Sequence, residues 1–358
     1  MGPYLANKTL QMGFTLFGVV TLVFFLFNVL PGDPSQMMLG QNQNEQQRFL
    51  IKKKYGFDLP IETQYLCFIN DLSPLSYHSK DTNSFTHYEK NKYGGVVVLS
   101  QSSGQWVLKL PYLRTSYQKR GKPVSEIIRE TLPNTIILAI AAMSIAVVFG
   151  ITLGIIAMLK KDHFIDKCLQ GVSTLGMSLP SFFSAILASW LFGLVLHEFT
   201  GLNMTGSLFE LDDYGETHQL TLKNLVLPAF VLGIRPLAVI IQLMRSSLLE
   251  VMEQDYIRTA RAKGLSLARI IYKHALKNAL NPVITAVSGW FASLLAGAIF
   301  VEYIFGWRGL GKEIVTALNL LDVPVIMGAV IIIAFFFIII NIVVDLLYVY
   351  LDPQIKLN

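Results

Sequence analysis

The sequence predicts an all-α membrane protein with six transmembrane helices, a mixed extracytoplasmic segment between the first two, and a short helical segment on the cytoplasmic side. The first observation behind this prediction is composition: 53% of the 358 residues are hydrophobic and only 15% are charged, against about 25% charged in an ordinary soluble domain. The others are long runs without charge and an uneven distribution of Lys and Arg. This composition excludes a disordered chain, a coiled coil and most soluble enzymes, and two cysteines cannot build a disulfide framework.

Uncharged runs locate the membrane spans. Five stretches of 22 or more residues contain no Asp, Glu, Lys or Arg, and a sixth run, 225–244, is interrupted only by Arg235. About 20 apolar residues cross the hydrocarbon core as a helix, and unpaired backbone groups are not tolerated in lipid. The predicted spans therefore lie near 9–30, 133–158, 172–196, 224–244, 283–305 and 325–350.

The first span also has to be weighed as a cleavable signal peptide. A single Lys8 precedes it, no small-residue cleavage site follows it, and its apolar run is longer than that of a typical signal sequence. We interpret it as a retained helix.

Lys and Arg in short loops set the orientation. The loop between spans two and three carries three lysines, and the loop between spans four and five carries seven cations against three acids. The loop between spans three and four carries five acids and no cation before Lys223. We therefore expect the first two loops and both termini in the cytoplasm. The segment 31–132 then lies outside despite its thirteen cations, which is acceptable because long segments translocate largely regardless of charge.

That outer segment is too long for a bare loop. Residues 96–100 and 105–109 flank a Gln-Ser-Ser-Gly turn and predict a β-hairpin. A helix is expected to begin at 125–129 and to lead into span two. The segment is interpreted either as a cap over the outer helix ends or as a docking platform for a partner, and the two are compatible. The predicted organisation is thus 1–30, 31–132 and a five-helix core over 133–358.

A polar but regular stretch follows span four. Good helix formers predict a helix over 247–263, with Gly264 in the left-handed position that ends it, Ser266 capping the next helix, and Pro282 breaking the chain before span five. A basic amphipathic helix resting on anionic lipid is the alternative. Small residues at the turn would let the backbone of a partner approach closely.

Here the chain resembles a known family. Residues 255–264, DYIRTARAKG, and 274–283, HALKNALNPV, resemble the EAA-type coupling motif of ABC-importer permeases in its dipeptide/oligopeptide/nickel form. The resemblance extends over almost the whole chain through further short motifs: Leu30–Pro34, Tyr55–Asp58 with Pro60, Pro123-Val124, Leu132-Pro133, Ser178–Phe182, Leu227–Ala229, Gly309–Gly311 and Asp352-Pro353.

This resemblance implies a non-catalytic permease subunit of the type I importer fold in a bacterial inner membrane. It implies a second permease, two cytoplasmic ATPase subunits that hold ATP and Mg, an extracytoplasmic substrate-binding protein and surrounding lipid as partners. No cofactor on this chain and no nucleic-acid partner are expected. Coupling helices are expected at about 245–282, and the resemblance assigns ATPase coupling to Asp255, Tyr256, Arg258, Thr259, Ala260, Arg261, Ala262, Lys263, Gly264, Leu265 and Ser266.

Two features depart from the family pattern. Residues from about 72 to 108 are expected to be an insertion, and Arg235-Pro236 lies unexpectedly inside span four. A charge at that depth is expensive and usually faces a cavity. Arg235 is interpreted either as a pore-lining cation that meets a peptide carboxylate or as a side chain that snorkels or pairs with a neighbouring subunit, with the second slightly favoured.

Residues 306–313, GWRGLGKE, imitate a nucleotide-binding P-loop. The motif fails because position 313 is Glu rather than Ser or Thr and because no strand precedes it. We expect a short outer loop there. Glu302 and Asp345 are expected to pair locally or at an interface, and the scattered histidines predict no metal site.

Two other functional classes are weaker. An ion-coupled secondary transporter needs acidic relays in mid-membrane, and only Asp345 offers one. A membrane-embedded enzyme needs paired acids, a Ser/His pair or a metal cluster near a span, and the sequence shows none. Peptides are the expected substrate class of the permease.

Overall fold

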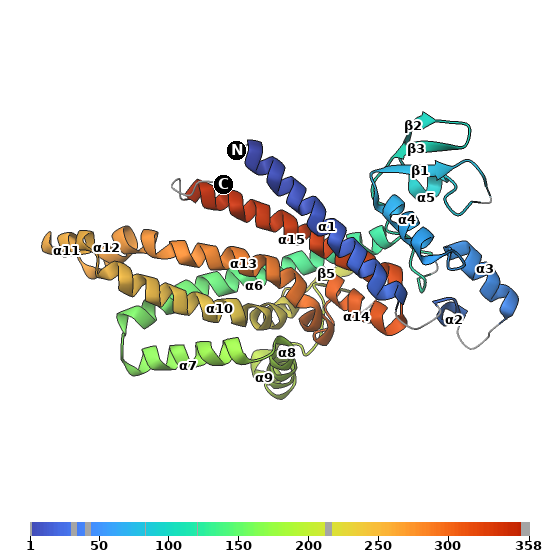
Figure 1. Cartoon of the computed structure of the whole chain (residues 1–358). Coiled ribbons are helices and arrows are strands. Elements are labelled where there is room, and N and C mark those ends of the chain that lie inside the picture. The colour runs from blue at the N-terminus through green and yellow to red at the C-terminus, as the bar shows by residue number, and fades with distance from the viewer. Residues whose placement is uncertain are drawn as a thin grey trace. The chain divides into compact units, whose positions relative to one another are not determined.

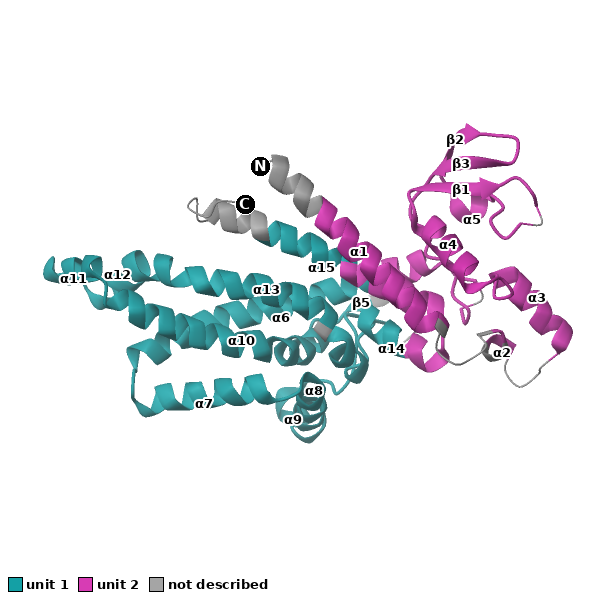
Figure 2. Ribbon diagram, in the orientation of Figure 1, with its two compact units in different colours: residues 1–8, 131–315, 335–358 teal, residues 9–130, 316–334 magenta. Residues whose placement is uncertain are grey.

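The chain divides into two compact units in a computed structural model, which describes residues 2–29, 34–39, 44–82, 84–119, 121–211 and 217–351. Unit 1 comprises residues 1–8, 131–315 and 335–358, and unit 2 comprises residues 9–130 and 316–334 (Figure 2). Helices α6 (Val124–Leu159) and α15 (Val323–Leu351) each contribute to both units.

Unit 1 is a helical bundle with a small hairpin. Its remaining elements are α7 (Phe164–Ser178), α8 (Ser181–Trp190), η1 (Leu191–Val195), α9 (His197–Thr200), β4 (Phe209–Leu211), β5 (His218–Leu220), α10 (Lys223–Met252), α11 (Asp255–Ala262), α12 (Leu267–Ile270), η2 (Ile271–Ala275), α13 (Leu276–Ile304) and most of α14 (Leu310–Leu320).

The predicted all-α membrane fold is confirmed, with one correction among its spans. Among the described residues, five helices are long and apolar enough to cross a membrane, and a bent pair, α7 with α8 and η1, raises the number to six if the pair counts as one span. The predicted continuous span 172–196 is wrong, because the chain bends by 110° between Ser178 and Ser181. Pro180 has no N–H and disfavours helical geometry at the residue before it, and Leu179 is accordingly extended (ψ 132°).

Helix α6 packs closely against α10 in unit 1. The two helices run side by side with α13 (Figure 1). An added Cβ would lie 2.6 Å from the Ile240 side chain at Gly150 and 2.6 Å from that of Met244 at Gly154. Small residues four positions apart let transmembrane helices approach in this way. Ile240 and Met244 are fully buried as a result.

Prolines do not interrupt these helices. Pro133, Pro228, Pro236 and Pro282 all lie inside helices, so the expected break at Pro282 is wrong. Transmembrane helices tolerate proline because local π or 3₁₀ adjustments and neighbouring groups satisfy the freed carbonyls. The irregular turn lies earlier, in the π-helical segment Ile271–Ala275.

Unit 2 combines helices with a three-stranded antiparallel sheet. Its strands β1 (Leu75–Ser79), β2 (Val96–Ser100) and β3 (Gly104–Leu108) lie in the order β1-β3-β2. The predicted hairpin is confirmed as β2 and β3, and the predicted helix start near 125 is confirmed as α6. Strand β1 was not predicted. The remaining elements are α1 (Gly2–Val29), α2 (Pro34–Leu39), α3 (Glu45–Tyr55), α4 (Ile61–Leu72) and α5 (Lys90–Tyr93).

The core of unit 2 joins segments that are distant in sequence. Phe24 of α1, Phe68 of α4 and Met327 of α15 are buried in one apolar cluster. The Asp322 carboxylate accepts hydrogen bonds from the Ser116 hydroxyl and from the Tyr117 N–H, the latter at 3.0 Å. These contacts tie the start of α15 to the segment that precedes α6.

Candidate functional site

The predicted coupling segment folds as two short helices around a tight turn at the tip of unit 1. Helix α10 ends at Met252, α11 covers Asp255–Ala262, and α12 begins at Leu267 and continues through η2 into α13. Figure 1 shows α11 and α12 together at one end of the bundle, where α10 and α13 terminate. The segment is therefore a direct extension of two long helices.

The turn after α11 is a Schellman motif. The Leu265 N–H donates to the Ala260 carbonyl at 3.3 Å, and the Gly264 N–H donates to the Arg261 carbonyl at 2.9 Å. These two bonds satisfy carbonyls that the helix end would leave free. Gly264 has φ +76°, so the predicted left-handed glycine is confirmed. Because an added Cβ at this glycine would meet no atom within 4 Å, backbone strain alone opposes a side chain there.

Burial divides the predicted coupling residues into an anchor and an exposed surface. Ala260 is buried, Leu265 is half-buried, and Ile257, which lies within the motif but was not among the predicted coupling residues, is fully buried. All three belong to the main hydrophobic cluster of unit 1. The exposed members, here called the coupling surface, are Asp255, Tyr256, Arg258, Thr259, Arg261, Ala262, Lys263, Gly264 and Ser266.

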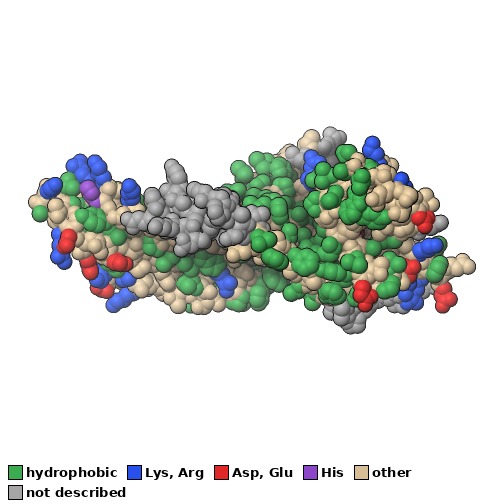
Figure 3. Space-filling model, turned by 45° about the horizontal axis from the view of Figure 1, so that its top comes forward, with side chains coloured by type: hydrophobic (Ala, Val, Ile, Leu, Met, Phe, Trp, Pro, Cys, Tyr) green, Lys and Arg blue, Asp and Glu red, His purple; other side chains and the backbone are tan. Residues whose placement is uncertain are grey.

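Polar contacts also involve this surface. Asn278 of α13 donates to the Tyr256 hydroxyl at 2.8 Å, and Arg258 pairs with Asp255 at 3.3 Å. The pair is exposed and of little energetic weight. Lys and Arg side chains gather at this end of unit 1 (Figure 3).

Two details of the prediction are wrong. The expected helix over 247–263 is interrupted, since Gln254 is extended (ψ 149°) and α10 and α11 are separate. Glu250 and Glu253 oppose the negative end of a helix dipole, whereas Asp255 suits the positive start of a new one. Ser266 occupies the N-cap position of α12 with an extended backbone, but its side chain makes no capping hydrogen bond.

A buried ion pair beside this segment was missed. The Asp166 carboxylate, 1% exposed, accepts from Arg245 Nε at 2.6 Å and from the second guanidinium nitrogen at 2.7 Å. It also accepts from the Asp162 N–H and from Gln170 Nε2. The pair joins the start of α7 to the last turns of α10. Only the two aspartates of a lysine-rich loop, Asp162 and Asp166, hinted at it in the sequence.

The P-loop-like glycines hold a carboxylate of the same chain. The Gly311 and Lys312 N–H groups donate to Glu302 Oε2 at 2.7 and 3.1 Å. An added Cβ at Gly309 would lie 2.4 Å from that carboxylate. The predicted local pairing of Glu302 is thus confirmed, because backbone N–H groups at the start of α14 hold its carboxyl group. The side chain of Asp345, for which the same was expected, lies outside the described residues.

Arg235 lies apart from the coupling segment, in the interior of α10. It lines a cavity of about 70 Å³ with residues of the α7–α8 bend and of α13, including Ser181, Ser184 and Trp290. Its Nε is buried and has no hydrogen-bond partner in the part of the chain that the structure describes.

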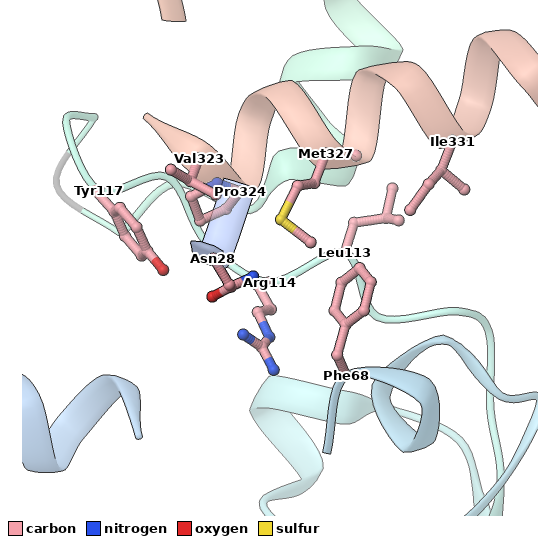
Figure 4. A pocket seen from close by; sticks show the side chains of 10 residues that line it. Asn28, Phe68, Leu113, Arg114, Tyr117, Val323, Pro324, Met327 and Ile331 are labelled. Carbon is pink, nitrogen blue, oxygen red and sulfur yellow. The ribbon is translucent and has the colours of Figure 1, made fainter. Parts of the chain in front are cut away.

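Unit 2 contains a smaller cavity of about 20 Å³, lined by Arg114 together with Asn28, Phe68 and Met327 (Figure 4). That volume accommodates about one water molecule. Arg114 already donates to Asp71 at 3.0 Å, so this cavity is a packing feature. Across the described ranges, no group of three His, Cys, Asp or Glu side chains is arranged to hold a metal ion.

Comparisons with known proteins agree with this architecture. Residues 150–357 match the family described as binding-protein-dependent transport system inner membrane component, and residues 1–94 match the N-terminal family of such membrane components.

Curated relatives match over the full length. The chain is 32% identical to the dipeptide transport system permease protein DppB of Alkalihalophilus pseudofirmus, covering 99% of this chain and 100% of that one. It is 33% identical to the di/tripeptide permease protein DppB of Pseudomonas aeruginosa (96% and 95% covered) and 31% identical to the oligopeptide permease protein AppB of Bacillus subtilis (99% and 100%).

A solved structure shares the fold. A chain of the MetNI methionine ABC transporter in an inward-facing conformation superposes with a TM-score of 0.51 at 14% identity, over 63% of this chain and 97% of that one. The chain is therefore a member of the family of binding-protein-dependent transport system inner membrane components, integral proteins of the inner membrane.

Proposed function

We propose that this chain is one of two permease subunits of an ATP-driven peptide importer and that its coupling surface docks on a cytoplasmic ATPase. The curated relatives are permease proteins for dipeptides, di/tripeptides and oligopeptides, which supports peptides as the cargo. The proposed partners are a second permease, two ATPases that carry ATP and Mg, and an extracytoplasmic binding protein. The chain itself contributes no catalytic group.

The observation that carries this proposal is the construction of the coupling segment. Ile257, Ala260 and Leu265 anchor it in the core of the bundle, and the Schellman turn fixes its shape. Because this exposed segment is continuous with α10 and α13, a movement of the docked partner can be transmitted to the membrane spans. ATP can drive such a switch only if the partner makes different contacts in the two states.

The proposed orientation places α11, α12 and both termini in the cytoplasm. The cation-rich end of unit 1 (Figure 3) supports this orientation, because Lys and Arg accumulate in short loops on the cytoplasmic side of the membrane. The proposed division of the chain into 1–30, 31–132 and 133–358 then places the three-stranded sheet outside, where it serves as a cap or a docking platform.

Reconstitution tests the proposal. The chain is co-expressed with the sister permease and the ATPases, purified, and placed in liposomes with the binding protein and a radiolabelled dipeptide. We expect co-purification of all four membrane-associated subunits and uptake that requires ATP, with no ATP hydrolysis by the isolated chain. Uptake driven by a proton or sodium gradient without ATP would instead support the secondary-transporter alternative.

A further inference from the structure

Arg235 carries an uncompensated charge inside the membrane-spanning part of unit 1. It lies 12 residues after the start of α10, about 18 Å along the helix. No Asp or Glu pairs with it among the described residues, and its buried Nε lacks an acceptor. The side chain as a whole is half-buried, and a cation at this depth in a membrane span is costly without a partner. An anion at this position would supply the acceptor that Nε lacks.

The cavity beside Arg235 has room for that anion. Its volume is about 70 Å³, several times the minimum that one water molecule requires. Hydroxyl-bearing residues line it from two sides: Ser181 and Ser184 from α8, and Ser293 from α13. Trp290 and Leu294 supply an apolar wall. A cation, hydroxyl groups and an apolar wall suit a carboxylate attached to an organic body.

The bend between α7 and α8 makes the electrostatic environment of this cavity more positive. Helix α8 begins at Ser181, at the edge of the cavity, and its N-cap Pro180 makes no side-chain capping hydrogen bond. A helix start carries partial positive charge and free N–H groups. In membrane proteins, broken spans are tolerated where they are buried or line a water-filled cavity. The break and Arg235 therefore favour the same kind of ligand.

A second, open groove lies further along α10, and its glutamine and serine side chains give it the character of a polar path. Arg235, Val239, Gln242 and Ser246 follow one another at spacings of four, three and four, so they share one helix face. The last three line an open groove of about 410 Å³ together with Gln170 of α7. Glutamine and serine side chains gain nothing from contact with lipid, but they suit the passage of a hydrated solute.

We propose that Arg235 and the serines beside it bind the terminal carboxylate of a peptide in transit, at the head of a polar path along α7 and α10. An importer of peptides with varied side chains can rely only on groups that all peptides share. Among these, the terminal carboxylate is the one that a lone guanidinium recognises. This inference rests on the proposed transport of peptides and specifies where the pore meets them.

Thiol chemistry tests the site without requiring transport. Ser184→Cys places a thiol in the cavity, with the exposed Cys168 changed to Ser and the buried Cys67 retained. In membranes containing the assembled complex, reaction rates are measured with an anionic and a cationic methanethiosulfonate of similar size. At about 6 Å in a water-like medium, one positive charge should shift the anionic-to-cationic rate ratio by about tenfold.

Arg235→Gln should abolish that shift, and Arg235→Lys should retain most of it. The same thiol should be protected by millimolar dialanine and far less by dialanine amide, which lacks the carboxylate. An unreactive thiol, an unchanged rate ratio in Arg235→Gln, or equal protection by the acid and the amide would each overturn the proposal.

Transport separates this inference from the proposed function. In reconstituted complexes we expect Arg235→Gln to lower dipeptide uptake about tenfold or more, while Arg129→Gln, an exposed arginine of α6, leaves it unchanged. Normal uptake in Arg235→Gln would refute the carboxylate site and leave the importer intact. Absence of ATP-dependent uptake by the wild-type complex would refute the importer, and the thiol rate ratio would still report on the anion site.

Discussion

Gly264 and Asp166 carry different kinds of constraint at the base of the coupling segment. Gly264 supplies a backbone angle: its φ of +76° closes the turn after α11. Asp166 supplies a charge: it holds Arg245 near the end of α10 through two hydrogen bonds. The first shapes the coupling surface and the second fixes the helix that carries it.

Gly264→Val should uncouple ATP hydrolysis from peptide uptake. A side chain in the left-handed region costs about 1–2 kcal/mol, and β-branched residues such as valine adopt that region least readily. The spans should still insert, since no neighbour lies within 4 Å of the new Cβ. Uptake per ATP hydrolysed in liposomes measures the effect. Gly171→Val, at an exposed helical glycine with equal space, is the matched control; coupled, wild-type uptake by Gly264→Val would contradict the docking model.

Asp166→Asn should loosen the junction between α7 and α10. Losing the charge that Arg245 binds should cost about 2 kcal/mol, a typical value for hydrogen bonds to charged groups. Thermal unfolding of the purified complex measures the loss. Adding Arg245→Gln to Asp166→Asn should restore part of it, because the guanidinium is no longer left unpaired. Equal destabilisation in the double variant and in the sum of the single ones would show that the pair is not coupled.

Helices α6 and α10 can approach closely because two positions on α6 are glycines, which have no side chain. Gly150 and Gly154 lie one turn apart on α6, facing Ile240 and Met244 of α10. The contact brings the second and fourth predicted spans together in unit 1. The stability of this contact should therefore fall when a larger side chain replaces either glycine.

Gly154→Leu should destabilise the bundle by about 2 kcal/mol, as overpacking of a tight interface generally does. The melting temperature of the purified complex is the appropriate measurement. Gly18→Leu serves as the control, because an added Cβ at this exposed glycine of α1 meets no atom within 4 Å. An unchanged melting temperature in Gly154→Leu would mean that the two helices do not pack as described.

The sheet of unit 2 should weaken in acid. His78 of β1 is fully buried, its Nδ1–H donating to the Thr86 carbonyl and its Nε2 contacting the Ser76 hydroxyl. Burial lowers the pKa of His78 below its ordinary value of 6.5, and the charges of Lys109 and Lys92 lower it further. The folded sheet thus favours neutral His78, so its stability is full above pH 6.5 and falls as the pH drops below it.

Hydrogen exchange of the β1 and β3 amides in the whole protein measures this effect. The wild-type sheet should exchange faster at pH 5 than at pH 7 after correction for intrinsic rates. In His78→Gln, which does not titrate, that difference should shrink. A difference of the same size in both proteins would exclude His78 as the cause.

Local features could be predicted from the sequence, and non-local ones could not. The hairpin around residues 101–103 and the left-handed Gly264 follow from turn chemistry within a few residues. Strand β1, Leu-Ser-Tyr-His-Ser, escaped notice because its buried positions are polar, Ser76 and His78. Their partners, the Thr86 and Val107 carbonyls, come from elsewhere in the fold.

In the coupling site, too, the local features could be predicted from the sequence and the non-local contacts could not. A motif of contiguous residues identified the coupling surface, but the Asp166–Arg245 pair joins residues 79 positions apart. Neither residue is distinctive within its own helix, so the sequence does not show that they pair with each other. Proline alone could not predict both outcomes: α7 ends just before Pro180, whereas α13 continues through Pro282. A helix continues past a proline where groups elsewhere in the fold satisfy the freed carbonyls.

At the scale of the whole molecule, unit 1 offers a mechanical path and a polar path along the same helix. Helix α10 carries Arg235 in its interior, Gln242 and Ser246 on the same face, and α11 just beyond its end. A movement imposed on the coupling surface would therefore act on the helix that lines the proposed peptide site. That arrangement suits a pore whose access is changed by a partner at one end.

Site-directed cross-linking tests the central claim most directly. Thr259→Cys, exposed on α11, is introduced with Cys168→Ser into the assembled complex, and a short thiol-to-amine cross-linker is added. We predict a covalent product between this chain and an ATPase subunit, and none from Ser102→Cys in the exposed turn between β2 and β3. Cross-linking of Ser102→Cys to the ATPase, or its absence from Thr259→Cys in an intact complex, would contradict the account.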